Sequence, residues 1–218
     1  MRFNSTIYNF ALPALAFALP LGLYIKTLAP TYIPIDSAEI ALCMKFWGAC
    51  HPPGFPTLIT IGKIFVEFFP LGSVIYRANL LTAIFGALTI LFVYLAQVRL
   101  NVGKVTAFLA AILLAVSSSF WEFAIAADVF TFATFLIALT IFLALSNRKY
   151  LAAFTLGVSV SHFYISAVIF PILVWYFWKE SESEKAGESK KSLLFIVFYT
   201  WPFRAGSFIF QARAKPGN

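Results

Sequence analysis

The chain has 218 residues, of which 61% are hydrophobic, 18% aromatic and only 11% charged. Soluble domains carry about a quarter charged residues, so this composition excludes a water-soluble globule. The net charge of +7 is expected to set the orientation of the chain across a membrane, and no nucleic-acid motif accompanies it. The sequence therefore predicts an all-α, polytopic bundle of transmembrane helices with about five to six spans.

The N-terminal third contains one long apolar run followed by a polar loop. Residues 8–28 are apolar and numerous enough to cross a bilayer, which takes about 20 residues. We interpret them as a retained first span and not as a removed signal peptide, because no convincing small-residue cleavage pattern is present. Residues 29–73 form the predicted first extracytoplasmic loop, in which 36–47 is a short helix and 57–69 a helix lying in the membrane interface.

Three more apolar runs are expected to span the membrane, at residues 74–98, 105–119 and 129–145. The turns near residues 99–104 and 148–149 are basic. Basic turns stay in the cytoplasm, which places the first loop on the outer face.

The fifth apolar run, residues 150–178, exceeds one upright helix yet barely allows two. One long tilted helix would put the loop at 179–191 outside, whereas a tight pair of short helices would put it inside, which its lysines favour. A further apolar run begins at residue 192, and residues 204–218 are polar and basic. We expect one transmembrane module over residues 1–203 and a disordered or truncated tail over 204–218.

Two carboxylates and a histidine gather on the first loop. Asp36 and Glu39 are three residues apart, so on a helix they share one face. Such a pair could act as a general base on an acceptor hydroxyl or hold a divalent cation against phosphate oxygens. The alternative is a solvated helix with Asp36 as an ordinary N-cap. His51 precedes two prolines that fix its backbone. Its imidazole either donates a hydrogen bond to a phosphate or is an ordinary polar side chain of a turn.

Other ionisable residues lie near the apolar runs. Arg77, at the head of the second span, could bind an anionic headgroup or diphosphate, or simply extend toward the interface. Asp128 begins the fourth span and is expected to turn inward, towards Arg77 or the first loop, in a structural or a catalytic role. Lys63 and His162 rank lowest, since an intramembrane histidine is more often packed than a ligand.

The two cysteines, Cys43 and Cys50, both fall in the first loop. Seven residues apart on one unbroken helix, they would stand roughly 10.5 Å apart, which is too far to bridge. Only a break near Gly48 would let them pair, so we expect free thiols.

Several motifs follow one another between residues 30 and 165: Asp36-x-x-Glu39, His51-Pro52-Pro53-Gly54, Tyr76-Arg77 with residues 80–86, the turn 121–128, and the Gly/Ser/His segment 156–162. In their order and spacing they resemble the GT-C class of membrane glycosyltransferases. The closest resemblance is to the protein O-mannosyltransferase-like branch, which includes a eukaryotic transmembrane O-mannosyltransferase and many bacterial members.

The resemblance implies an integral membrane enzyme of the bacterial inner membrane or the ER. It would transfer a mannose-like sugar from a polyprenyl-phosphate donor to a hydroxyl of a protein or lipid on the extracytoplasmic face. Asp36 would then deprotonate the acceptor with Glu39 as its partner, His51 and Arg77 would bind the lipid phosphate, and Asp128 would support the site. No metal or other cofactor is required, although a divalent cation is possible, because the leaving group is already a phosphate.

Two other classes of function compete with this hypothesis. A transporter or lipid-binding protein would be expected to show an inverted repeat with broken helices in both halves, and the sequence shows none. An inactive fragment or assembly subunit would keep the fold, and this alternative is favoured by the expected loss of the C-terminal half that family members carry.

Overall fold

The computed structural model describes residues 5–33 and 36–186. Within these ranges every regular element is a helix, which confirms the all-α prediction. The apolar run beginning at residue 192 and the tail 204–218 lie outside the described residues.

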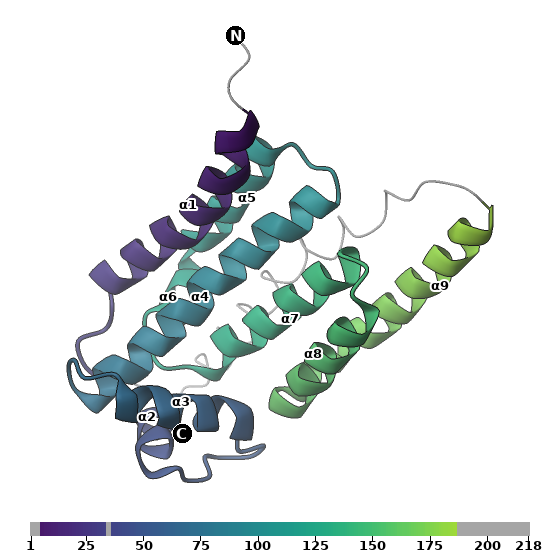
Figure 1. Cartoon of the computed structure of the whole chain (residues 1–218). Helices are drawn as coiled ribbons and strands as arrows, with labels where there is room; N and C mark the ends of the chain where they lie inside the picture. Colours follow the sequence, from purple (N-terminus) through teal and green to yellow (C-terminus); the bar gives the residue numbers. More distant parts are fainter. Residues whose placement is uncertain (1–4, 34–35, 187–218) are drawn as a thin grey trace, which may run out of the picture.

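A layer of long helices forms the body of the molecule. α1 (Ser5–Lys26), α4 (Val74–Arg99) and α7 (Val129–Leu145) lie side by side, with α4 in the middle and packed on both neighbours (Figure 1). α5 (Lys104–Ala115) packs against α1 and α4. The sequence of α4 is apolar around its whole circumference and has no single hydrophobic face, so the helix can be covered on several sides.

Aromatic rings fix the contact between α4 and α7. The ring centroid of Phe85 lies 4.7 Å from that of Phe132 and 5.3 Å from that of Phe135. Such pairs contribute about 0.5–1.5 kcal/mol each beyond the burial of their area. They hold the N-terminus of α7 against the N-terminal half of α4, next to the first loop.

Two short helices fold the first loop into a compact unit at one end of the bundle. α2 (Ser37–Phe46) and α3 (Pro56–Phe68) pack on each other and on α4, which confirms both predicted helices of the loop. α2 ends where Trp47 adopts a left-handed conformation and the N–H of Gly48 donates to the carbonyl of Cys43. α3 begins with a proline at its first position, where the missing N–H has no helical partner.

The expectation of free thiols is wrong, because Cys43 and Cys50 form a disulfide. The left-handed Trp47 ends α2 and turns the chain back, which brings the two Cα atoms to 5.9 Å. This spacing is normal for a disulfide. The break allowed for at Gly48 is therefore real.

The predicted third span is also wrong in its extent. α5 ends at Ala115, and α6 (Ser118–Ala124) leaves it at an angle of 68°. The run of serines from residue 117 lies at this bend, where the Ser117 hydroxyl donates to the Leu114 carbonyl.

The fifth apolar run forms a pair of helices and not one tilted helix. α8 (Lys149–His162) is followed by a short 3-10 helix, η1 (Tyr164–Ile169), and by α9 (Phe170–Ala186). The ammonium of Lys149, at the start of α8, lies 5.8 Å from the ring centre of Phe177 in α9. α9 therefore runs back beside α8, toward the end of the bundle that holds the basic turn 148–149.

Membrane-spanning helices can be judged by length and composition. Among the described helices, α4 alone is long and apolar enough, with a mean hydropathy of 2.1, and α5 and α6 pass together as a bent pair. Shorter apolar helices cover residues 10–26, 129–145 and 164–179. One or two of the predicted spans are thus supported in this way, and the total of about five to six stays a prediction.

Candidate active site at the first loop

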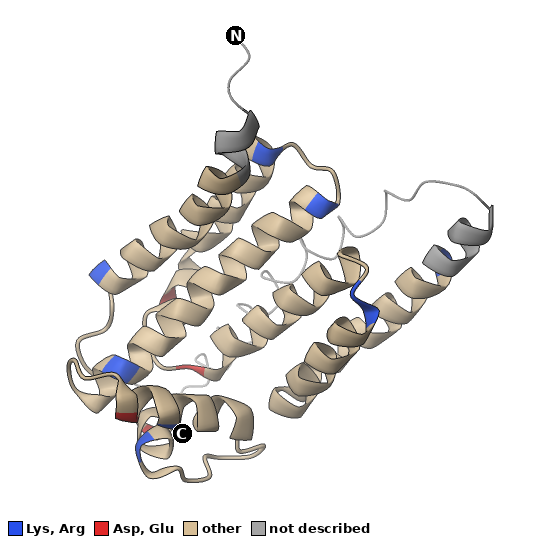
Figure 2. Cartoon of the chain, in the orientation of Figure 1, with Lys and Arg blue, Asp and Glu red and all other residues tan. Residues whose placement is uncertain are grey.

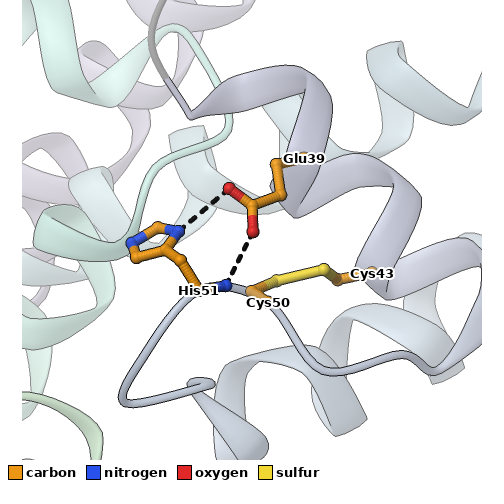
Figure 3. Close-up of a disulfide and its surroundings, with 4 residues drawn as sticks. All are labelled: Glu39, Cys43, Cys50 and His51. Carbon is orange, nitrogen blue, oxygen red and sulfur yellow. Dashed lines mark hydrogen bonds and ion pairs between the residues drawn. A yellow bond between two sulfur atoms is a disulfide. The ribbon is translucent and has the colours of Figure 1, made fainter.

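A carboxylate and a histidine are joined by two hydrogen bonds in the first loop. The backbone N–H of His51 donates to Glu39 Oε1 at 2.6 Å, and Nδ1 of its ring lies 2.9 Å from Glu39 Oε2 (Figure 3). The hydrogen bonds from His51, that of its side chain first, lower the pKa of Glu39, which is therefore ionised at neutral pH. An ionised carboxylate only accepts, so Nδ1 carries the proton and Nε2 lies on the far side of the ring.

The disulfide holds this pair in place from both sides. Cys43 follows Glu39 by one helical turn on α2, and Cys50 directly precedes His51. Figure 3 shows the disulfide beside the two hydrogen bonds, so that the turn 47–51 is tied to α2 by a covalent and a polar link. His51 also packs edge-on against Phe55, with ring centroids 5.1 Å apart.

Asp36 lies at the N-terminus of α2 but does not cap it. It occupies the N-cap position, yet its side chain makes no capping hydrogen bond. The Ser37 hydroxyl instead closes a small turn by donating to the Ile33 carbonyl and accepting from the Ile33 N–H, both at 2.8 Å. Asp36 thus has the position of an N-cap without its hydrogen bond, and its carboxylate stays available for other partners.

The predicted grouping of Asp36, Glu39 and His51 is confirmed as geometry. One ligand atom from each can be chosen so that all three lie within 4.8 Å of one another. Oxygen and imidazole ligands at this spacing suit a divalent cation. However, both carboxylate oxygens of Glu39 already accept hydrogen bonds from His51. A cation bound here would compete with that pair.

Asp128 faces Asp36 across a small cavity. The cavity measures about 30 Å³, which is enough to admit a water molecule or a hydroxyl group, and is lined by the following residues: Ile33, Asp36, Ser37, Glu122, Phe123, Ala126, Ala127 and Asp128. Asp128 is 8% exposed and caps α7 by accepting from the N–H of Phe130 at 2.6 Å. Burial, and less strongly the charge of Asp36, raises its pKa from 3.8 to about 7. Of the two inward directions predicted for Asp128, the first loop is the observed one.

Arg77 is engaged elsewhere. Its guanidinium donates to the Val66 carbonyl at 2.6 Å and to the Gly72 carbonyl at 2.9 and 3.2 Å. These carbonyls lie at the end of α3 and in the turn that follows it, and Arg77 does not line the cavity. In this structure Arg77 fastens α3 to α4, and the phosphate-binding role stays a prediction.

Lys63 also has structural partners. Its ammonium donates to the Lys45 carbonyl at 2.9 Å and to Glu67 Oε1 at 2.8 Å, and Lys45 binds the same oxygen at 3.0 Å. Hydrogen bonds from Lys63 and then Lys45 lower the pKa of Glu67 to about 2. This group of charges joins α2 to α3.

Comparisons with known proteins place the chain in a family. A family model, the protein O-mannosyl-transferase TMEM260 N-terminal domain, matches residues 36–186. This match begins at Asp36 and covers more than half of the chain. The chain belongs to the TMEM260 N-terminal domain family.

Two curated relatives carry the same name. The chain is 30% identical over 202 residues to protein O-mannosyl-transferase TMEM260 of Mus musculus, covering 87% of this chain and 28% of the relative. It is 23% identical to protein O-mannosyl-transferase tmem260 of Dictyostelium discoideum, covering 82% of this chain and 24% of the relative. The chain thus spans about a quarter of the length of these relatives. No solved structure matches it.

Sequence reasoning missed the role of Asn79 in this TMEM260-type domain. The side chain is fully buried on α4 and bonds to both loops that line the cavity. An amide in the first turns of an otherwise apolar run was the available signal, because a buried polar group needs partners.

His162 was ranked last but lies close to the first loop. It is fully buried, its Nε2 lies 3.0 Å from the Val129 carbonyl, and its ring packs on Phe55 and Phe132 at centroid distances of 5.4 and 4.8 Å. The packed alternative therefore describes it well: His162 joins α8 to the loop and to the start of α7.

Proposed function

We propose that the chain is the catalytic N-terminal module of an integral membrane glycosyltransferase. It transfers a mannose-like sugar from a polyprenyl-phosphate donor to a hydroxyl of a protein, or otherwise of a lipid, at the extracytoplasmic or lumenal face. Membership of the TMEM260 N-terminal domain family supports the class of reaction. The observation that carries the assignment of the site is the carboxylate of Asp36, which makes no capping hydrogen bond to α2 and lines the small cavity.

Asp36 is the proposed general base. The acceptor oxygen forms a bond to the anomeric carbon of the sugar while the bond from that carbon to the phosphate oxygen breaks. The acceptor proton passes to Asp36, and the lipid phosphate leaves with the bonding electrons. General-base catalysis of this kind contributes about 10²–10⁴-fold to the rate.

His51 is the proposed contact for the lipid phosphate. Glu39 orients its ring through Nδ1, so Nε2 is the nitrogen that can donate to a phosphate oxygen when the imidazole is protonated. Arg77 would have to give up the carbonyls of Val66 and Gly72 to share this role. We therefore assign the phosphate contact to His51 before Arg77.

The proposal requires no cofactor. A divalent cation could be held by Asp36, Glu39 and His51, and it would neutralise charge on the phosphate. Binding one would displace the hydrogen bonds that keep Glu39 and His51 together, so we propose transfer that persists in the presence of a chelator.

Sugar transfer from a polyprenyl-phosphate mannose donor by membranes that contain the full-length protein tests the site. We expect Asp36→Asn to reduce the rate by about 10²-fold or more, because an amide cannot accept the acceptor's proton. Glu67→Gln is the matched control, since it makes the same change on the same loop outside the cavity and breaks only exposed ion pairs.

The three possible outcomes have different consequences. Loss of activity in Asp36→Asn alone supports a glycosyltransferase with this base. Equal activity in Asp36→Asn and the unmodified protein refutes the site assignment. No transfer by any of the three proteins refutes the proposed reaction and favours a transporter or a non-catalytic subunit.

A further inference from the structure

The two walls of the cavity come from segments far apart in the chain. One wall is the start of the first loop, with Ile33 and Asp36, and the other is the turn before α7, with Ala127 and Asp128. Their separation decides how far Asp36 lies from Asp128. Two carboxylates facing each other repel when both are charged, so something must hold these walls together.

Asn79 of α4 contacts the second wall at Ala127 and the segment that leads into the first wall, at Ala29 and Thr31. Its Nδ2 donates to the Ala29 carbonyl at 2.9 Å and to the Thr31 carbonyl at 3.4 Å. Its Oδ1 accepts from the N–H of Ala127 at 2.7 Å. The side chain is 0% exposed, so these bonds are shielded from competing water.

Other bonds join the same segments but not to α4. The N–H of Ala29 donates to the Ile125 carbonyl at 3.0 Å, and the indole N–H of Trp121 donates to the Thr27 hydroxyl at 2.9 Å. They keep the two segments adjacent. Asn79 alone among these contacts fixes both to a long, buried helix, which makes their position relative to the rest of the site definite.

We propose that Asn79 is a positioning residue of the site, which sets the distance between Asp36 and Asp128 by holding the segments 29–31 and 127–128 against α4. The inference rests on the proposed function for its catalytic consequence. Asn79 touches neither donor nor acceptor. It acts through the width and orientation of the cavity in which the acceptor hydroxyl must meet the base.

A set of variants separates this role from a general loss of stability. Asn79→Ala removes all three bonds, whereas Asn79→Asp keeps the acceptor for Ala127 and turns the donor side into a carboxylate facing two carbonyls. Thr82→Val is the matched control, because Thr82 is equally buried one turn further along α4 and its hydroxyl bonds only within the helix, to the Ala78 carbonyl.

Steady-state sugar transfer by the full-length protein is the first readout. We expect Asn79→Ala to lower kcat by about 10²-fold, the effect of misplacing a catalytic group by about 1 Å, with the KM for the donor changed less than about threefold. Thr82→Val should keep both constants. A parallel loss of kcat and gain of KM in Asn79→Ala, or no change in either, would overturn the proposal.

Hydrogen exchange of the backbone amides provides a second readout that needs no activity. Asn79→Ala should speed exchange in the segments around residues 29–33 and 125–128, and Asn79→Asp should do so mainly in the first of these. Unchanged exchange in both variants contradicts the positioning role even if no transfer is detected. If the unmodified protein shows no transfer but exchange at these segments is faster in Asn79→Ala, the proposed function is refuted while the positioning role of Asn79 is supported.

Discussion

At the scale of single residues, Asp128 carries the largest electrostatic cost in the site. It is buried, receives one backbone N–H and faces another carboxylate, so its pKa lies at about 7, up from 3.8. A carboxyl that holds its proton more tightly when folded stabilises the protein at low pH. The contribution of Asp128 to the free energy of unfolding therefore falls as the pH rises from about 4 to about 7 and is level above that.

Asp128→Asn tests this sign. The amide oxygen can still accept from the N–H of Phe130, while no charge is buried at any pH. We expect the unfolding temperature of the variant, relative to the unmodified protein, to be higher at about pH 8 than at about pH 4. Thermal unfolding in detergent at the two pH values measures the difference. A difference that stays constant with pH would show that Asp128 is already ionised in the folded protein without penalty.

At the scale of elements, the α2–α3 pair depends on a close contact between a glycine and a methionine. A Cβ atom added to Gly62 would overlap the buried side chain of Met44. The pair is closed on its exposed side by Lys45, Lys63 and Glu67. Exposed ion pairs contribute little to stability, so the apolar contact contributes more than these ion pairs to the packing of α3 on α2.

Gly62→Val should therefore destabilise the protein by about 1–3 kcal/mol, the usual cost of overpacking a filled core. Gly157→Ala is the control, because no atom lies within 4 Å of an added Cβ on α8 and alanine favours a helix. Chemical unfolding of both variants gives the comparison. Equal stability of Gly62→Val and the unmodified protein would mean that Met44 moves aside freely.

At the scale of the whole molecule, charge and disulfide chemistry indicate the same orientation. In Figure 2 the Asp and Glu residues coloured red lie toward the end of the bundle with α2 and α3, together with some Lys and Arg. The turns near residues 99–104 and 148–149, toward the opposite end, are basic. Basic turns face the cytoplasm, and disulfides persist in oxidising compartments. From both we predict that the first loop lies outside or in the lumen.

Single cysteines introduced into a background without Cys43 and Cys50 test this orientation. Tyr32→Cys, on the exposed part of the first loop, should react with a membrane-impermeant maleimide in intact cells or right-side-out vesicles. Gly103→Cys, at the exposed turn before α5, should react only after permeabilisation. Labelling of Gly103→Cys in intact membranes would show that the chain has the opposite orientation.

The sequence by itself determined the helical class and the neighbourhood of the site. Apolar run lengths are a local property, so α1, α4 and α7 begin and end close to where hydropathy changes. Asp36, Glu39 and His51 could be grouped because they are near in the chain and α2 is a regular helix. The sequence left open whether residues 150–178 form one helix or two, and it wrongly predicted free thiols. Both outcomes depend on a single residue at a helix end: the extended Phe163 after α8 and the left-handed Trp47 after α2.

The tertiary structure alone decided which distant segments meet. Asp128 faces the first loop and not Arg77, because Asn79 ties residues 29–31 and Ala127 to α4, whereas Arg77 is held by carbonyls of α3 and the turn after it. Arg77 and Lys63 are cationic, as the sequence shows, but both already have partners within the protein. Arg77 donates to carbonyls of α3 and the turn after it, and Lys63 donates to a carbonyl of α2 and a carboxylate of α3. Residue type specifies what a side chain can bind, whereas the packing of helices that are remote in sequence determines what lies within its reach.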